Sequence, residues 1–545
     1  MSLYNKASLI QVPSLYKDGL LVSTVPEDRS GDFTVARGSN LSATRIGEDG
    51  YIKKGYENLL LQSNNFSDSV WGGAGIETPQ TGYEGYDGTN DAWSLTSSVT
   101  GFPRITQNIS NTGLASYSVY LKGNNDFFAQ VRTFGINAHI WVELVGEGTI
   151  SAESGEIYHR IDNLGNGWYR VQLTVDGTIN SVRIYPASAV GVYSTSGNGI
   201  LIQDAQLNQG LVAYPYLEST TAPAQGGLLE NAPRLDWSNG VPAVFVEEQS
   251  TNDIALSEYT PSGNNAAVSY NQTLSPEGYN NALKLTITGT SQGGIITSNA
   301  YVSINTTYTQ SCYVKKDVGD YFGFGLFQVG MPINNNNYIR WNLSDITLEP
   351  DVQGSYVNPK AEDVGNGWIR LSVTITTVDN GVKSGWKFLS MRSNSFQDSD
   401  VGNSFYIYGM QAEPNKTSVS SYIPTYGTSQ TRSNETVSDT FTIPTTATIY
   451  NSFYAPASEQ VYILDQVFSV SKGLNKVAIA FSPTAIKISV GGAIVASSTG
   501  SYDTTSLTSI SLGSDSGADY SNAPISGFYI FPEFLTDDEL NSLTA

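Results

Sequence analysis

The stretch Leu164-Gly-Asn-Gly-Trp-Tyr-Arg170 decides the fold, because it recurs almost unchanged downstream as Val364-Gly-Asn-Gly-Trp-Ile-Arg370. Working outward, further blocks recur in the same order, such as Ser118-Val-Tyr-Leu-Lys122 and Ser311-Cys-Tyr-Val-Lys315. The spacing between partner blocks drifts along the chain, as it does when loops change length while strands keep their pattern. The chain therefore contains two diverged copies of one domain.

Alternation of apolar and polar residues predicts that both copies are built from antiparallel β-strands. Trp168-Tyr-Arg-Val-Gln-Leu-Thr-Val175 and Ser181-Val-Arg-Ile-Tyr185 alternate with a period of two, which is typical of a β-sandwich. We assign repeat A to residues 56–220 and repeat B to residues 251–428, each as an antiparallel, jelly-roll-like sandwich. A connector punctuated by Pro and Gly, residues 221–250, joins them.

The two ends of the chain differ from the repeats. Residues 1–55 hold short strand-like pieces that bury too little apolar surface to fold alone, so we expect an extended N-terminal docking arm. Residues 430–545 contain alternating strand segments and close on a short helix with Thr536 as its N-cap. The expected fold class is all-β, with a third sandwich after the two repeats.

Composition limits the possible partners. A formal net charge of -22 on 545 residues argues against nucleic acid and against an anionic membrane surface. Cys312 is the only cysteine, which excludes an intrachain disulfide, and its strand-like context predicts a buried structural residue. No segment is long and apolar enough to cross a bilayer, and the first residues lack a signal-peptide pattern, so we expect synthesis in a cytoplasm.

Motifs outside the repeats carry a family resemblance. Asp32-Phe-Thr-Val-Ala-Arg37 and Asn231-Ala-Pro-Arg-Leu-Asp-Trp-Ser-Asn-Gly240 resemble two halves of a segment found in modular bacteriophage virion proteins, the tail-fibre and head-fibre-like appendages. Repeat A is inserted between these halves. Ile525-Ser-Gly-Phe-Tyr-Ile-Phe-Pro532 and Leu535-Thr-Asp-Asp-Glu-Leu540 are similar to the end of the laminin-G/concanavalin-like lectin domain of that class. The resemblance implies carbohydrate-binding-module-like repeats and a C-terminal lectin-like domain.

Tryptophans are the candidate sugar-binding residues, since an aromatic ring can bury the apolar face of a sugar. Trp168 matches Trp368 and Trp141 matches Trp341, and their presence in both copies favours a role in the core. The other tryptophans have no partner in the second copy and are the better candidates for carbohydrate binding, although a structural role stays open for each. These four are Trp71, Trp93, Trp237 and Trp386.

One loop of repeat A is a candidate metal site. Asp87 and Asp91 flank a short Gly-Thr-Asn loop, and loop carboxylates often bind Ca²⁺ in lectin-type sandwiches. Repeat B has Glu277 and Asn281 at the same places. Asp87 and Asp91 are therefore candidate Ca²⁺ ligands, and we expect no other cofactor.

No motif of nucleophilic or zinc-dependent hydrolysis is present in the sequence. Neither of the two histidines, His139 and His159, stands in such a motif. A glycosidase needs only two carboxylates, but the acidic residues here stand mostly in turns, where turn and capping roles explain them. We therefore expect a protein that is not an enzyme.

Together these features predict a virion appendage of tail-fibre or head-fibre type that binds host-surface or environmental glycans. We expect its arm to attach it to other virion proteins, and resemblance to phage fibres implies a homotrimer. The alternatives are a glycan-degrading depolymerase and a secreted bacterial polysaccharide-binding adhesin.

Overall fold

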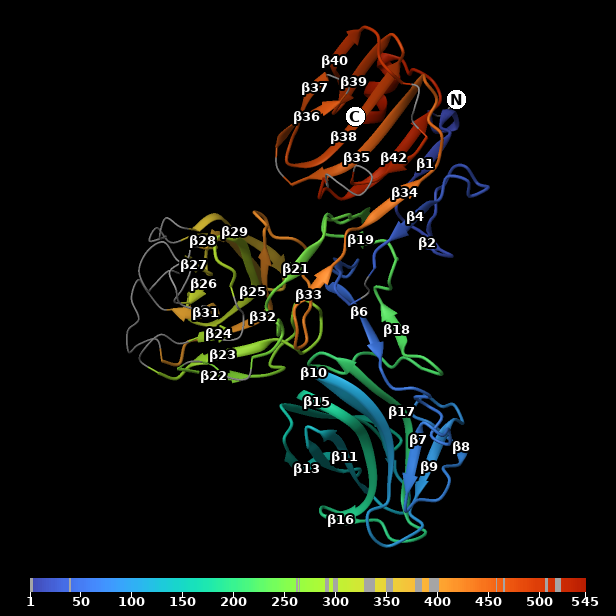
Figure 1. Cartoon of the computed structure of the whole chain (residues 1–545), viewed down its shortest axis with the longest axis vertical. Coiled ribbons are helices and arrows are strands. Elements are labelled where there is room, and N and C mark those ends of the chain that lie inside the picture. The colour runs from blue at the N-terminus through green and yellow to red at the C-terminus, as the bar shows by residue number, and fades with distance from the viewer. Residues whose placement is uncertain are drawn as a thin grey trace. The chain divides into compact units, whose positions relative to one another are not determined.

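A computed structural model describes residues 3–38, 41–260, 263, 265–289, 294–297, 302–327, 339–348, 356–377, 385–391, 401–456, 458–463, 466–504, 508–514 and 521–545. The chain is all-β and antiparallel, as predicted, and Figure 1 follows its strands from the N-terminus to the C-terminus. It forms two compact units: unit 1 comprises residues 1–54, 228–250 and 431–545, and unit 2 comprises residues 55–227 and 251–430. Within the described ranges, no helix has the length and apolarity that crossing a membrane requires.

Unit 1 is built on two antiparallel sheets and a hairpin. The larger sheet contains, in order, β19 (Leu235–Asp236), β20 (Ala243–Val244), β42 (Ile525–Phe531), β35 (Ala447–Ala455), β38 (Gly473–Ser482), β39 (Ala485–Val490) and β40 (Ala493–Thr499), with β1 (Leu9–Gln11) also paired to β42. The smaller sheet contains β2 (Tyr16–Lys17), β3 (Leu20–Leu21), β4 (Phe33–Ala36), β34 (Thr436–Asp439) and β41 (Ile510–Ser511). The hairpin joins β36 (Glu459–Ile463) to β37 (Gln466–Val470).

Two short helices lie at the ends of the chain. A 3-10 helix, η1 (Leu3–Lys6), opens it, and α1 (Asp537–Thr544) closes it. The predicted N-cap of α1 is confirmed, because the Thr536 side chain accepts a hydrogen bond from the backbone of Glu539 while the Glu539 carboxylate accepts one from the backbone of Thr536. This reciprocal pair satisfies two backbone donors that the first helical turn leaves free.

Residues 1–54 belong to the core of unit 1 and differ in this from the extended docking arm expected for residues 1–55. Leu9 lies opposite Ile530 in the β1–β42 pair, and β4 pairs with β34. Leu9, Leu21 and Phe33 are fully buried in one apolar cluster with side chains from the C-terminal part of the chain. The expectation failed because the apolar surface that this segment cannot bury alone is covered by the same chain.

A buried network of ion pairs joins the three segments of unit 1. Arg234, from the connector, lies 2.8 Å from Glu247 and donates a second hydrogen bond of 2.8 Å to Glu435. Arg37 lies 3.3 Å from Glu435, and Arg432 lies 3.3 Å from Glu247. All three arginine side chains are fully buried. Because these five residues come from all three segments, the network ties them together.

Repeat A is a sandwich whose two layers share two long strands, β10 (Arg104–Gly123) and β15 (Trp168–Ala189), visible as the long curved arrows of Figure 1. The first layer contains, in order, β8 (Thr81–Tyr83), β9 (Ala92–Thr96), β17 (Gly199–Gln209), the second half of β10, the first half of β15, and β14 (Tyr158–Gly165). The second layer contains β7 (Trp71–Ala74), the first half of β10, the second half of β15, β11 (Phe128–Gly135), β12 (His139–Glu143) and β13 (Thr149–Ser154). A short strand, β16 (Val192–Tyr193), pairs with the end of β15.

Repeat B has the same strand order, so the predicted pair of homologous sandwiches is confirmed. Its first layer contains β22 (Ala266–Ser269), β23 (Leu283–Ile287), β32 (Ser404–Pro414), β25 (Thr307–Val318), β30 (Trp368–Thr376) and β29 (Tyr356–Gly365). Its second layer contains β24 (Gly294–Thr297), β31 (Gly385–Met391), β26 (Tyr321–Phe327), β27 (Ile339–Asn342) and β28 (Thr347–Leu348). Each long strand of repeat A corresponds to two strands here.

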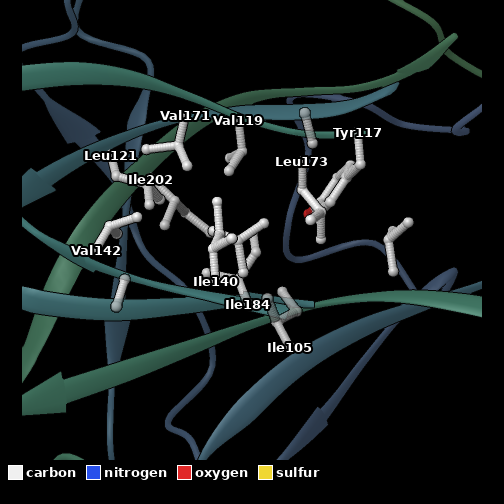
Figure 2. Packing of buried hydrophobic residues seen from close by; sticks show 14 of the residues in the cluster. Ile105, Tyr117, Val119, Leu121, Ile140, Val142, Val171, Leu173, Ile184 and Ile202 are labelled. Carbon is white, nitrogen blue, oxygen red and sulfur yellow. The ribbon is translucent and has the colours of Figure 1, made fainter. Parts of the chain in front are cut away.

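Apolar side chains between the two layers form the core of each repeat. Figure 2 shows side chains of both layers meeting in repeat A, among them Val119, Val171, Ile140 and Ile184, and all four are fully buried. The equivalent core of repeat B includes Cys312, also fully buried, which confirms the structural role predicted for it.

The duplication extends to individual side chains. The amide of Asn58 donates hydrogen bonds of 3.0 and 2.8 Å to two backbone carbonyls, and Asn252 makes the matching pair at 3.1 and 2.9 Å in repeat B. Trp168 and Trp368 occupy equivalent positions after their shared turn and are each 1% exposed. The structural role that the sequence favours for this tryptophan pair is confirmed.

Each repeat is joined to unit 1 by paired strands. β6 (Ile52–Asn58) pairs with β5 (Thr44–Ile46) and β18 (Ala224–Gly227) around repeat A. Around repeat B, β21 (Ser250–Asn252) pairs with β33 (Gln430–Arg432). Both repeats are therefore insertions in the sequence of unit 1.

Candidate functional site

Two of the four candidate tryptophans donate hydrogen bonds to backbone carbonyls near the start of repeat A. Trp71 is 5% exposed, packs against Phe66 with ring centroids 5.0 Å apart, and donates a hydrogen bond of 3.0 Å to the carbonyl of Gln62. Trp93 is partly buried and donates one of 2.8 Å to the carbonyl of Asn64. Buried indole donors with backbone partners are typical of structural tryptophans. Trp71 therefore offers no open ring to a sugar.

The other two candidates lie elsewhere. Trp237 belongs to unit 1, is partly buried, and its backbone amide donates to the carbonyl of Ile46 at 3.0 Å. Trp386 lies in β31 of repeat B, and its side chain falls outside the described residues. Among the described side chains, Trp71 and Trp93 thus belong to repeat A, whereas Trp237 belongs to unit 1.

Asp87 and Asp91, the predicted Ca²⁺ ligands, share an amide donor. The Gln203 side chain lies 3.4 Å from Asp87 and 2.7 Å from Asp91, and Asn64 donates to Asp91 at 3.0 Å. In repeat B the hydroxyl of Tyr408, the residue matched to Gln203, donates to Glu277 at 2.9 Å. Side-chain donors thus satisfy these carboxylates in both copies, and calcium binding stays a prediction.

A different surface of repeat A gathers aromatic rings. The side chains of β11, β12 and β15 alternate between the core and the outer face of the second layer. On the outer face, Tyr193 lies at the centre of three rings, with centroids 5.1 Å from Phe102, 5.2 Å from Trp141 and 5.3 Å from Tyr185. Phe102 is 66% exposed, whereas Trp141 and Tyr185 are buried beneath Tyr193. The cluster therefore presents exposed rings on a rigid aromatic support.

Two arginines adjoin this ring cluster. Arg132 in β11 lies directly opposite Arg183 in β15, and both guanidinium groups approach the exposed ring of Phe134, at 5.9 and 4.2 Å from its centroid. Arg183 also lies 3.5 Å from the hydroxyl of Tyr185, which connects the arginines to the rings. Among the described residues, neither arginine forms an ion pair with a carboxylate. Like charges directly opposite in a sheet are unfavourable, and an anion bound between the two guanidinium groups would relieve their repulsion.

Trp141 and Trp341, matched in the sequence, do not occupy equivalent positions. Trp341 lies opposite Phe322 and belongs to the core of repeat B. Trp141 lies opposite Gln130 and contacts the ring of Tyr193 on the outer face. A shift of one residue reverses the face because strand side chains alternate. Trp141 is 6% exposed, so the structural role favoured for it holds, but its ring supports the ring cluster on the outer face and is not part of the core between the layers.

The sequence contains a pattern that indicates the aromatic outer face of repeat A, although the unpaired tryptophans do not point to it. Along Arg132-Thr-Phe134 and Arg183-Ile-Tyr185, the positions facing away from the core hold arginine and aromatic residues. An exposed strand face ordinarily carries small polar or mixed charged residues, so large rings there distinguish this face from an ordinary solvent-exposed one.

Three comparisons with known proteins were made, with family models, curated proteins and solved structures. No protein-family model matches the chain, and no curated protein matches it. Among solved structures, the chain is similar to the N-terminal CBM22-1-CBM22-2 tandem domain of Paenibacillus barcinonensis Xyn10C, at 12% identity and a TM-score of 0.23, over 69% of this chain and 99% of that one. A likeness this distant carries no argument about function, which rests on the residues described above.

Proposed function

We propose that repeat A binds acidic glycans, without cleaving them, through the outer face of its second layer. The observation that carries the proposal is the juxtaposition of exposed rings at Phe102 and Phe134 with the Arg132–Arg183 pair. Aromatic rings bury the apolar faces of sugars. Guanidinium groups donate paired hydrogen bonds to carboxylates. Together they match a polymer of carboxylate-bearing sugars.

Because the protein as a whole is negatively charged, its attraction for an acidic glycan must come from local contacts with the two arginines. A net charge of -22 repels an acidic polymer at long range. Salt screens that repulsion beyond about 8–10 Å at physiological ionic strength, whereas a carboxylate seated between two arginines is in direct contact with them. Arginine also stays protonated at neutral pH and so neither gives nor takes a proton. The arginine pair therefore contributes to binding and not to hydrolysis.

Calorimetric titration of the full-length protein with polygalacturonate tests the proposal, with the methyl-esterified polymer as the neutral counterpart. The acid form should bind and the ester should bind at least about tenfold more weakly, since a hydrogen bond to a charged group contributes about 1.5–3 kcal/mol. Arg183→Gln and Tyr193→Ala should each reduce affinity for the acid form. Arg160→Gln and Tyr83→Ala, which remove the same groups from other strands of repeat A, should not. Equal binding of both polymers would overturn the acidic preference.

The same variant separates a binding role from a structural one. If Arg183 serves the ligand, Arg183→Gln should change the free energy of unfolding by no more than about 1 kcal/mol, because the loss of its contact with Phe134 is offset by relief of the repulsion from Arg132. Chemical denaturation measures this change. Steady release of reducing ends from the polymer by the wild-type protein would contradict the non-catalytic part of the proposal.

We also propose that the chain is a virion appendage of tail-fibre or head-fibre type and a homotrimer. The support is the resemblance of Asp32-Phe-Thr-Val-Ala-Arg37 and residues 231–240 to the phage segment. Attachment would then involve unit 1, to which both motifs belong. Immunogold labelling of purified virions and light scattering of the purified protein test the two parts separately. Absence of label from intact particles would overturn the first part, and a monomeric mass would overturn the second.

A further inference from the structure

The open edge of the repeat A sandwich brings together three potential metal ligands. β13 is the edge strand of the second layer, β14 is the edge strand of the first, and the three residues 155–157 connect them. Glu153 lies opposite the core residue Ile140, and His159 lies opposite the core residue Leu173. Because paired residues share a face, both side chains point to the space between the layers, at its rim.

The spacing of the ligand atoms fits one small cation. Nδ1 of His159 lies 3.0 Å from Oε2 of Glu153 and 3.8 Å from Oε1 of Glu156. All three ligand atoms lie within 4.8 Å of one another. Ligands at about 2.0–2.2 Å from a tetrahedral Zn²⁺ are roughly 3–4 Å apart. An imidazole with two carboxylates suits Zn²⁺ and its neighbours, whereas Ca²⁺ and Mg²⁺ prefer oxygen ligands alone.

A second observation concerns Glu156 itself. Its side chain is 10% exposed, and its Oε2 is buried and accepts no hydrogen bond from the described residues. His159 is also the ion-pair partner of both Glu153 and Glu156 within the described part of the chain. A buried carboxylate oxygen without a donor is unfavourable unless a cation satisfies it.

The other histidine lies within electrostatic reach of the same carboxylate. Burial, and secondarily Arg132, lower the pKa of His139, whereas Glu156 acts to raise it. Nδ1 of His139 is buried and has no hydrogen-bond partner among the described residues.

Repeat B shows that the fold does not need this cluster. Counted back from the shared Gly-Asn-Gly-Trp turn, the place of His159 is taken by Pro359, and a bulge between Val357 and Lys360 brings Tyr356 opposite Ile375. Tyr356 is buried in the core of repeat B. Repeat B thus has no histidine at the place of His159 and buries a tyrosine beside this edge.

We propose that Glu153, Glu156 and His159 bind one divalent transition-metal ion of the Zn²⁺ class, which links β13 to β14 and closes the edge of the sandwich. Three protein ligands leave a fourth position for water. The site is independent of the proposed glycan face and makes no use of the Arg132–Arg183 pair.

Titration of chelator-treated full-length protein with ZnCl₂ against a chromophoric chelator tests the proposal. We expect one equivalent of Zn²⁺ per chain and a higher melting temperature of the zinc-loaded protein. Co²⁺ should give the visible absorption of a four-coordinate nitrogen and oxygen site, and Ca²⁺ in excess should not compete. His159→Ala and Glu156→Gln should each weaken Zn²⁺ affinity by more than the roughly 10–100-fold that outer-shell changes cost.

The matched control is Glu147→Gln, which removes an exposed carboxylate just before β13 and should leave affinity unchanged. Melting curves recorded in chelator establish that each variant is folded. If folded His159→Ala and Glu156→Gln proteins bind Zn²⁺ as tightly as wild type, the metal binds elsewhere and the proposal is wrong. No binding by the wild-type protein would overturn it equally.

Discussion

At the scale of single residues, Asp204 in β17 shows how the fold sets a charge. Burial raises the pKa of its carboxyl to about 7, the negative charges of Asp91 and Asp87 act in the same direction, and a hydrogen bond from Tyr86 opposes them. Because the folded pKa lies above the unfolded one, the native state binds more protons between about pH 4 and 7. The stability of repeat A should therefore fall as pH rises through that window.

Asp204→Asn should remove this dependence. The backbone at Asp204 has φ of 49°, which Asn tolerates, and the amide can still accept from Tyr86. We expect the variant to melt at a higher temperature than wild type at pH 8 and at nearly the same temperature at pH 4. Calorimetry in the presence of chelator, which removes any bound Ca²⁺, measures the difference. Identical melting curves of the two proteins at pH 8 would show that ionisation of Asp204 does not lower the free energy of unfolding.

Equivalent residues of repeats A and B could be predicted from the sequence where a shared turn fixes the backbone, and could not where no such turn is present. The Gly-Asn-Gly turn sets the register of Trp168 and Trp368, so their equivalence was predictable. Trp141 and Trp341 stand at different distances in sequence from the preceding strand, and a slip of one position reversed their faces. The opposition of Arg132 and Arg183 depends on a pairing between distant strands, which local alternation does not reveal.

At the scale of elements, β1 carries apolar side chains into a sheet that the rest of the chain builds. The backbone of Ser8, just before β1, donates to the carbonyl of Ile530 at 2.8 Å. Sequence alternation predicted strands in both segments, but it cannot tell which strands pair when hundreds of residues separate them. An isolated reading of residues 1–55 therefore predicted an arm, although these residues are part of a core.

Leu9→Ala should destabilise unit 1 by roughly 2–5 kcal/mol, the cost of a cavity at a fully buried leucine. Leu15→Ala is the control, since Leu15 stands in the same segment but is 50% exposed. Chemical denaturation followed by a probe in unit 1 compares them. Equal stability of the two variants would mean that the segment does not pack as described.

Glu435→Gln should destabilise unit 1 by roughly 3–5 kcal/mol. The change removes one carboxylate from a buried network and leaves Arg37 and Arg234 without their shared charge partner. The same measurement on Glu533→Gln, at an ion pair that is nearly half exposed, should give a loss within about 1 kcal/mol. If Glu435→Gln lowered the free energy of unfolding by no more than that, water or another group would have to compensate the buried charges of Arg37 and Arg234.

At the scale of the whole molecule, the chain is one all-β unit whose sequence is interrupted by two copies of another domain. The insertion of repeat A was predictable, because the phage-like motifs at residues 32–37 and 231–240 lie on either side of it. The insertion of repeat B was not, because the strands that complete unit 1 after residue 431 were read as a separate domain. Discontinuous units can be recognised only from contacts.

The paired strands β6 and β18 have a mechanical consequence. If a glycan held by repeat A is pulled, the tension passes to unit 1 along two neighbouring strands, because Gly55 and Gly227 lie side by side in an antiparallel pair. Each strand then carries about half the load, and the two are pulled in the same direction, so their hydrogen bonds are not peeled apart. A tether of two paired strands resists extension better than a single linker does.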